Sequence, residues 1–420
     1  MNEKQILSAV AAVAALSVFG ASDGTGGFKI GQRMTLRPYV ALSYTWDSNI
    51  DTGKHGLHGS QWTVNPGLGI DYKGSNWSLS GALWYQHHSY SRYQSELNTA
   101  SYGESLNFSF NNVNDGRGWN IRLAQKYQTF SQDDDLSKSD GRGMWRDRQQ
   151  LSFDGSVSRS IRDYLHMGVH GGYYLMDYDN NINKYAPLYG WKRASLGANV
   201  GIAVGKNTDF VLSGTFHQAW QDNDKDLYAD RREWDSEPRG KNIGSKSRGG
   251  SVSAGFSSRA TERITYHATA GWSWFDYGEG VDKSGSITYN VSARWRISDT
   301  LNLMVHGSSY YQPSEREYGS YLKDYTLGVG LGKSFIRGRL SGTLDLTYRK
   351  ETHPYTEYSE DDFDEDIITV RVGCNYRIWR YVSAYATGEY QTTETQGGGA
   401  HNHEYDYDRW RVTVGMRLAY

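Results

Sequence analysis

The feature that most constrains this chain is a strict alternation of apolar and polar residues that lasts ten or more residues at a time. Between positions 410 and 420, one alternate set reads Trp, Val, Val, Met, Leu, Tyr, and the other reads Arg, Thr, Gly, Arg, Ala. Residues 62–72, 287–297 and 368–378 repeat this pattern. Successive side chains of a β-strand point to opposite faces, so each segment predicts a strand with one apolar and one polar face.

The length of these segments and the residues at their ends favour a membrane barrel. They run for about 10–15 residues, whereas strands of soluble proteins usually have about 5–6. Aromatic residues stand at the ends of many apolar faces, as Trp77 and Tyr85 do, and aliphatic residues fill the middle. This is typical of the aromatic girdles of transmembrane β-barrels. The alternative is a soluble β-sandwich or β-helix, which needs neither such long alternation nor aromatic strand ends.

Composition excludes several other classes of protein. The mean hydropathy is −0.71, and no run of 18 apolar residues follows the N-terminus, so membrane-spanning helices are excluded. Aromatic residues make up 14% of the chain and the net charge is −2, which argues against disorder and against a nucleic-acid partner. A single cysteine, Cys374, excludes an intrachain disulfide scaffold.

The alternation predicts an all-β, antiparallel transmembrane β-barrel of the Gram-negative outer membrane, with its apolar wall in contact with outer-membrane lipid. We count 18 strands, and an error of one pair would give 16 or 20. They span residues 36–47, 61–73, 76–88, 101–111, 117–130, 148–158, 163–177, 191–204, 208–221, 249–258, 262–275, 286–297, 300–311, 321–333, 337–349, 367–378, 381–391 and 406–420.

Tight turns alternate with long polar connections, such as residues 131–147, 222–248 and 350–366. In outer-membrane barrels the short turns are periplasmic and the long loops extracellular. The first and last connections are both long, so both termini are expected in the periplasm.

Both ends of the chain carry candidate targeting signals. Residues 1–20 are predicted to be a signal peptide, because Lys4 precedes an apolar run at 6–18. The alternative is an ordinary buried helix. Residues 21–35 are then a periplasmic segment and 36–420 the barrel. The last eight residues have the form polar-x-Gly-x-x-apolar-x-aromatic, through Thr413, Gly415, Leu418 and Tyr420. This form resembles the signal read by the barrel assembly machinery, which is therefore an expected partner.

The opening strand carries a family resemblance. Residues 36–50 contain a proline and end in Trp46-Asp47-Ser48-Asn49-Ile50. This segment resembles the start of the putative beta-barrel porin 2 family, whose chains also share this length and high tyrosine content. Some members lie in exopolysaccharide loci. The resemblance implies an outer-membrane exit for such a polymer, working with a periplasmic polysaccharide export protein.

A barrel of 16–18 strands encloses an aqueous lumen, so its inward residues form the functional surface. The alternation places a basic strip inward, and arginine clusters in a pore favour anions such as an acidic polysaccharide. In the alternative interpretation these side chains pair with inward carboxylates and brace the wall. The strip consists of Arg122, Lys126, Arg294, Arg296, Arg371, Arg377, Arg409, Arg411 and Arg417.

Inward aromatic residues are candidates for stacking on sugar rings. They are Trp84, Tyr174 and Tyr385, and the alternative is that these rings simply pack within the wall. A register shift of one residue would reverse every inward assignment.

No motif for catalysis, a cofactor or a metal site emerges. His401 and His403 form a sparse ligand set, and the acidic run at 357–366 lacks the spacing of a calcium loop. We therefore predict that the protein is not an enzyme and needs no cofactor. The first hypothesis is an export pore for an anionic exopolysaccharide. The alternatives are a passive porin for small anions or oligosaccharides, and a surface binding or adhesion barrel with a plugged lumen.

Overall fold

The computed structural model describes residues 27–49, 58–91, 99–113, 117–130, 148–162, 164–178, 190–221, 246–276, 284–313, 321–353, 363–397 and 406–420. These residues form β-strands and one short 3-10 turn, η3 (Ile336–Gly338). The strands are β1 (Phe28–Ile30), β2 (Met34–Asp47), β3 (Gly59–Lys73), β4 (Trp77–Tyr90), β5 (Thr99–Asn111), β6 (Gly118–Phe130), β7 (Arg148–Arg162), β8 (Leu165–Tyr178), β9 (Trp191–Gly205), β10 (Thr208–Gln221), β11 (Lys246–Ser258), β12 (Ile264–Asp276), β13 (Ser284–Arg296), β14 (Leu301–Pro313), β15 (Tyr321–Phe335), β16 (Leu340–His353), β17 (Phe363–Arg377), β18 (Val382–Gly397) and β19 (Tyr407–Ala419). No helix in the described part is long and apolar enough to cross a membrane.

The strands from β2 to β19 form one closed antiparallel barrel. Each strand pairs with its neighbour in the sequence, and β19 pairs with β2 from Arg411 opposite Asp47 to Ala419 opposite Tyr39. Closure leaves no free sheet edge among strands β2–β19. The short strand β1 lies outside this ring and pairs with the start of β2. The backbone N–H and C=O groups of the strands therefore find hydrogen-bond partners within the ring, as a hydrocarbon environment requires.

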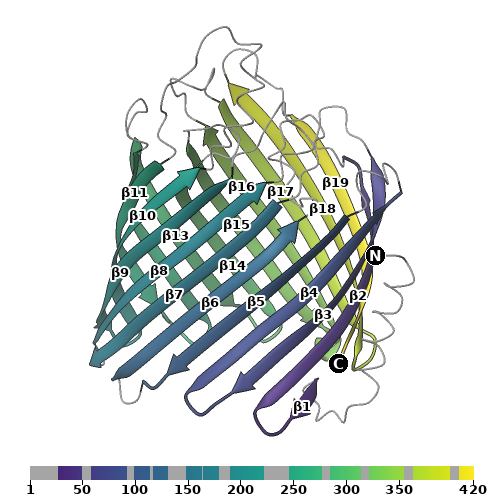
Figure 1. The fold of residues 1–420 in the computed structure, drawn as a ribbon, viewed down its shortest axis with the longest axis horizontal. Coiled ribbons are helices and arrows are strands. Elements are labelled where there is room, and N and C mark those ends of the chain that lie inside the picture. Colours follow the sequence, from purple (N-terminus) through teal and green to yellow (C-terminus); the bar gives the residue numbers. More distant parts are fainter. Residues whose placement is uncertain are drawn as a thin grey trace.

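The two ends of the barrel differ in their connections (Figure 1). The connections β1–β2, β3–β4, β5–β6, β7–β8, β9–β10, β11–β12, β13–β14, β15–β16 and β17–β18 are short and share one end, which we call the short-turn end. The ring of Phe28 stacks on that of Tyr420 with centroids 4.5 Å apart, so β1 and the end of β19 also lie there. The other connections lie at the opposite end, the long-connection end.

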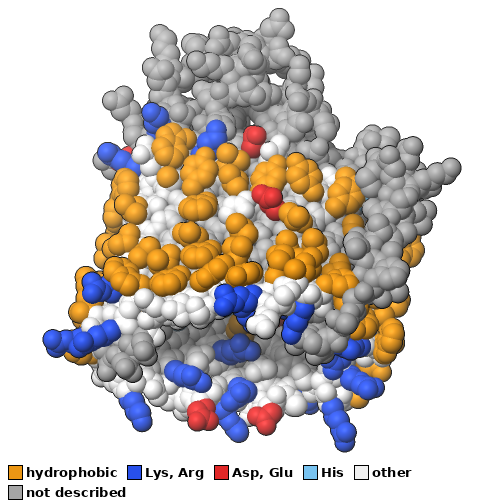
Figure 2. All heavy atoms as spheres, turned by 60° about the horizontal axis from the view of Figure 1, so that its bottom comes forward, with side chains coloured by type: hydrophobic (Ala, Val, Ile, Leu, Met, Phe, Trp, Pro, Cys, Tyr) orange, Lys and Arg blue, Asp and Glu red, His pale blue; other side chains and the backbone are white. Residues whose placement is uncertain are grey.

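The outer surface of the wall carries a belt of apolar side chains on the face seen in Figure 2. Val252, Val372 and Val414 are 53%, 53% and 48% exposed in the middle of their strands, where a soluble protein would bury them. Their chain neighbours face the lumen. The belt matches the apolar band by which a transmembrane barrel contacts lipid.

The belt is interrupted at one polar pair on neighbouring strands. The carboxylate of Glu104 on β5 is exposed on the outer face and accepts a hydrogen bond from Nε2 of Gln125 on β6 at 3.2 Å. This hydrogen bond lowers the cost of placing the carboxylate beside Leu106 in an apolar surface.

The sequence prediction of an 18-stranded antiparallel barrel is confirmed by β2–β19. Six strands begin two to four residues earlier than predicted, and two of them are informative. The first begins at Met34 because residues 28–30 pair with it across a tight turn. The sixteenth, β17, begins at Phe363, because the acidic residues 364–366 pair with β16 and β18 instead of belonging to a loop. The predicted signal peptide and most of the predicted long loops lie outside the described residues.

We expect a charge placed in the apolar belt to destabilise the barrel. Val252→Arg should lower the free energy of unfolding by about 2–4 kcal/mol, because it places a cation near the middle of the lipid-facing band. Ser253→Arg, one position along, points into the lumen and should cost well under half of that. Urea unfolding of both variants in lipid vesicles measures the difference, and equal destabilisation would show that the two faces are assigned wrongly.

Candidate functional site

The lumen wall across the barrel closure carries a row of alternating charges. Asp345, Arg371, Glu389, Arg411 and Asp47 lie directly opposite one another on β16, β17, β18, β19 and β2. Directly opposite residues share a face of the sheet, so cross-strand pairs of unlike charge stabilise the neighbouring strands. We call these five residues the charged row.

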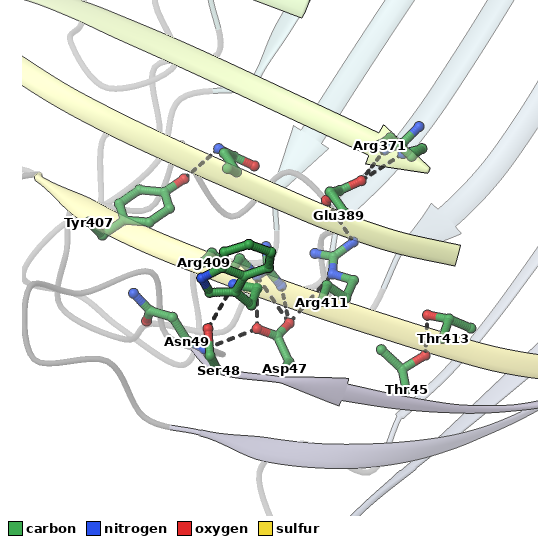
Figure 3. Close-up of polar contacts among 12 residues, drawn as sticks. Thr45, Asp47, Ser48, Asn49, Arg371, Glu389, Tyr407, Arg409, Arg411 and Thr413 are labelled. Atoms are coloured by element: carbon green, nitrogen blue, oxygen red, sulfur yellow. Dashed lines mark hydrogen bonds and ion pairs between the residues drawn. The ribbon is translucent and has the colours of Figure 1, made fainter. Parts of the chain in front are cut away.

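Ion pairs connect four members of the charged row (Figure 3). Arg371 Nε donates to Glu389 Oε2 at 2.7 Å, and Arg411 Nη1 lies 3.8 Å from the other oxygen of Glu389. Arg411 Nε also lies 3.5 Å from Asp47 Oδ2. The carboxylate of Asp345 lies over Gly330 on β15 and makes no ion pair with Arg371 in the described residues.

Asp47 is also the anchor of Arg409, one step nearer the long-connection end. Arg409 Nε lies 3.0 Å from both carboxylate oxygens, and the side chains of Arg409 and Asp47 are only 5% and 12% exposed. The same carboxylate accepts a hydrogen bond from the backbone N–H of Asn49 at 3.0 Å. Asp47 therefore ties the end of β2 to β19.

The structure places all nine residues of the predicted basic strip on lumen-facing positions of their strands, but it divides them into two groups. Arg371, Arg409 and Arg411 form ion pairs with Glu389 and Asp47, as the bracing interpretation expected. Six others form no ion pair with any described residue. These are Arg122, Lys126, Arg294, Arg296, Arg377 and Arg417. Whether the strip guides a cargo stays a prediction.

A second charged cluster lies towards the long-connection end of β15–β17. Arg349 Nε lies 2.5 Å from Asp324 Oδ2, and Arg349 Nη2 lies 2.6 Å from Glu351 Oε1. Asp324, Glu351 and Glu365 are at most 2% exposed. The sequence did not reveal this cluster, because Glu351 and Glu365 fall in a stretch predicted to be a loop and only strand pairing brings them beside Asp324 and Arg349. Within the described part of the chain, no group of histidine, cysteine, aspartate and glutamate side chains is arranged to hold a metal ion.

Basic residues concentrate at the short-turn end. Among the described residues in the short connections and directly flanking them, twelve are basic, whereas only Glu262 and Asp299 are acidic. Figure 2 shows basic side chains along the lower edge of the face in view. The twelve residues are Arg33, Lys73, Arg117, Arg162, Lys206, Arg259, Arg263, Arg296, Arg337, Arg339, Arg377 and Arg380. We call them the basic rim.

The predicted sugar-stacking residues are half-buried in the lumen wall. The ring of Trp84 covers Gly103 on β5, and that of Tyr385 covers Gly415 on β19, so closely that a Cβ atom at either glycine would overlap the ring. Tyr174 stacks on Trp191 with centroids 4.6 Å apart. One face of each ring therefore packs against the wall, as the structural interpretation expected. Stacking on sugars stays a prediction.

Tyr39, which the sequence analysis did not single out, belongs with these rings. It lies opposite Gly67, which in turn lies opposite Trp84, so the two aromatic residues share one row of the wall. The guanidinium carbon of Arg417 lies 4.4 Å above the Tyr39 ring centroid, a cation–π contact. Odd-numbered residues of β2 are all lumen-facing, so the alternation alone contained the signal for both Tyr39 and Asp47.

The residues of the predicted assembly signal all take part in the barrel closure. Thr413 Oγ1 lies 2.8 Å from Thr45 Oγ1, and Gly415 accommodates the ring of Tyr385. Leu418 pairs with Val40, and the buried Tyr420 stacks on Tyr381 with centroids 4.8 Å apart. Recognition of these residues by assembly machinery stays a prediction.

Comparison with known proteins gives one family match, in the C-terminal part of the chain. Residues 225–420 match the family model described as Putative beta-barrel porin 2, which confirms the predicted family resemblance over this part of the chain. The opening segment at 36–50 lies outside the match. No curated protein matches the sequence.

Solved outer-membrane barrels resemble the structure at very low sequence identity. The outer membrane protein opdK of Pseudomonas aeruginosa is 11% identical with a TM-score of 0.46, covering 92% of this chain and 99% of its own. The copper transporter OprC is 9% identical with a TM-score of 0.46, covering 94% and 82%. The ferric enterobactin receptor PfeA of Pseudomonas aeruginosa is 8% identical with a TM-score of 0.42, covering 91% and 80%.

We expect one substitution at the β19–β2 pairing to destabilise the barrel strongly. Asp47→Asn should lower the free energy of unfolding by about 2–5 kcal/mol, because it removes the carboxylate that faces the buried guanidinium of Arg409. Glu394→Gln, an exposed carboxylate on the neighbouring β18, is the control and should change stability by less than about 0.5 kcal/mol. Urea titrations in lipid vesicles compare them, and equal midpoints would contradict the role of Asp47.

Proposed function

We propose that this outer-membrane barrel is a channel that exports an anionic exopolysaccharide, with its short-turn end in the periplasm. The observation that carries the proposal is the difference in charge between the two ends of the barrel. The basic rim surrounds the short-turn end, whereas the buried carboxylates of Asp324, Glu351 and Glu365 lie towards the other end. Short turns of outer-membrane barrels are periplasmic, so the polymer would meet the basic end first.

Electrostatics explain how such a gradient favours an anionic chain. A mouth lined by cations raises the local concentration of anions and guides them inwards. Conduction also requires binding weak enough for the solute to leave. Along the charged row, Glu389 and Asp47 neutralise Arg371 and Arg411, so this part of the wall offers hydrogen-bonding groups without a strong net charge.

The aromatic residues of the lumen add a feature that suits sugars. Tyr39 and Trp84 share one row, and Tyr385 lies on β18, two strands from Tyr39. All three are partly exposed on the lumen side. Aromatic rings offer an apolar face to the C–H groups of a sugar, and the neighbouring arginines supply forked donors for carboxylates.

The unpaired lumen cations should set ion selectivity. Replacing Arg122, Arg296 and Arg377 with Ser should lower the ratio of anion to cation permeability by at least about twofold in planar bilayers, because these cations have no neutralising partner among the described residues. Removing Arg371 and Glu389 together is the matched control, since it leaves the net charge of the wall unchanged. A ratio that responds equally to both variants, or to neither, would contradict the assignment.

Export itself is tested in the native host. Deleting the gene should abolish acidic polysaccharide in the medium and leave polymer in the periplasm, and the intact gene should restore export. If secretion continues while uptake of small anions falls, the barrel is a passive porin. If neither changes and purified protein conducts no ions, the lumen is plugged and the barrel serves surface binding.

A further inference from the structure

A cavity of about 650 Å³ opens at the short-turn end of the lumen, between β8 and β14. Its volume lies within the usual range of small-ligand sites. It is bounded by the β9–β10 and β11–β12 turns and by lumen-facing residues of β12–β14, and it shares no residue with the charged row, which begins on β16. We propose that this pocket binds an acidic sugar unit, through cations for its carboxylate and a mixed polar and apolar wall for its ring.

The charges that line the pocket favour an anion. Lys206, Arg259 and Arg294 are exposed cations, and none forms an ion pair with a described residue. Asp209 is the one carboxylate among the lining residues. The pocket therefore has an excess of positive charge, which attracts a carboxylate.

Neutral polar side chains supply the groups that hydroxyls need. His267 lies directly opposite Ser257 on one side and Ser292 on the other, so an imidazole and two hydroxyl groups share one row of the pocket wall. His166 is held in place by a 2.9 Å hydrogen bond between its Nδ1 and the Oγ atom of Ser160. These groups both donate and accept hydrogen bonds, as the hydroxyls of a sugar do.

An apolar side chain completes the wall and distinguishes a sugar acid from a bare anion. Met304 lies directly opposite Arg294 on the lumen side and is 46% exposed. An exposed thioether beside a guanidinium offers a pliable apolar surface next to a carboxylate-binding group. A sugar acid presents this combination of a C–H face and a carboxylate, whereas inorganic phosphate has only the charge.

The pocket deepens the proposed export function and rests on it for its physiological role. Its position at the short-turn end would let the pocket capture an acidic residue of the polymer before the chain passes further into the lumen. Binding to the purified barrel is independent of conduction, so failure of one can be told from failure of the other.

Isothermal titration calorimetry on the full-length protein in detergent tests the pocket, with glucuronate as probe and glucose and inorganic phosphate as comparisons. Wild type should bind glucuronate in preference to both. The triple variant Lys206→Gln, Arg259→Gln, Arg294→Gln should bind glucuronate at least about tenfold more weakly, because it loses three charge-assisted contacts. Met304→Ser should weaken glucuronate and leave phosphate unchanged.

The matched control removes three cations from the same end of the barrel but outside the pocket, through Lys333→Gln, Arg337→Gln and Arg339→Gln. It should bind glucuronate as wild type does, and gel migration before and after heating verifies that every variant forms a folded barrel. If both triple variants lost the same glucuronate affinity, the loss would reflect the net charge of the barrel end, and the proposed binding pocket would be wrong. Wild-type binding of glucose or phosphate as strong as that of glucuronate would overturn the sugar-acid assignment.

Discussion

Every peptide N–H and C=O group that crosses hydrocarbon needs a partner, because water is not there to provide one. In this protein the pairing of β19 with β2 closes the ring and meets that requirement for the first and last barrel strands. The residues around this seam reflect its importance. Thr45 and Thr413 pair across it, Asp47 holds Arg409, and Tyr420 packs between Phe28 and Tyr381.

The same arginines and carboxylates stabilise the wall and set the charge that the lumen presents to a solute. A buried guanidinium is costly without a carboxylate, so Arg409 requires Asp47 for structural reasons. Once Arg371 and Arg411 are paired with Glu389, their charge is no longer available to attract a solute. Selectivity then depends on the cations that the wall leaves unpaired, and these lie mainly towards the short-turn end.

The fold was predictable from the sequence because the alternation is a local property of each strand. Val412, Val414 and Met416 point outwards because every second side chain of a strand lies on the same face, and lipid requires an apolar face. The strand count and the shared end of the short turns follow from that pattern. The early start of β17 was missed because Asp364 and Asp366 look like loop residues until β16 and β18 pair with them.

The sequence by itself determined that the chain is an outer-membrane barrel and which residues face its lumen, since both follow from period and register. Only the tertiary structure decided which lumen charges neutralise one another. Asp47 and Arg411 are separated by most of the chain and become neighbours only through closure. The pocket beside Arg294 likewise needs turns from two hairpins and side chains from the successive strands β8 to β14, and no local sequence pattern shows which distant residues a closed ring brings together.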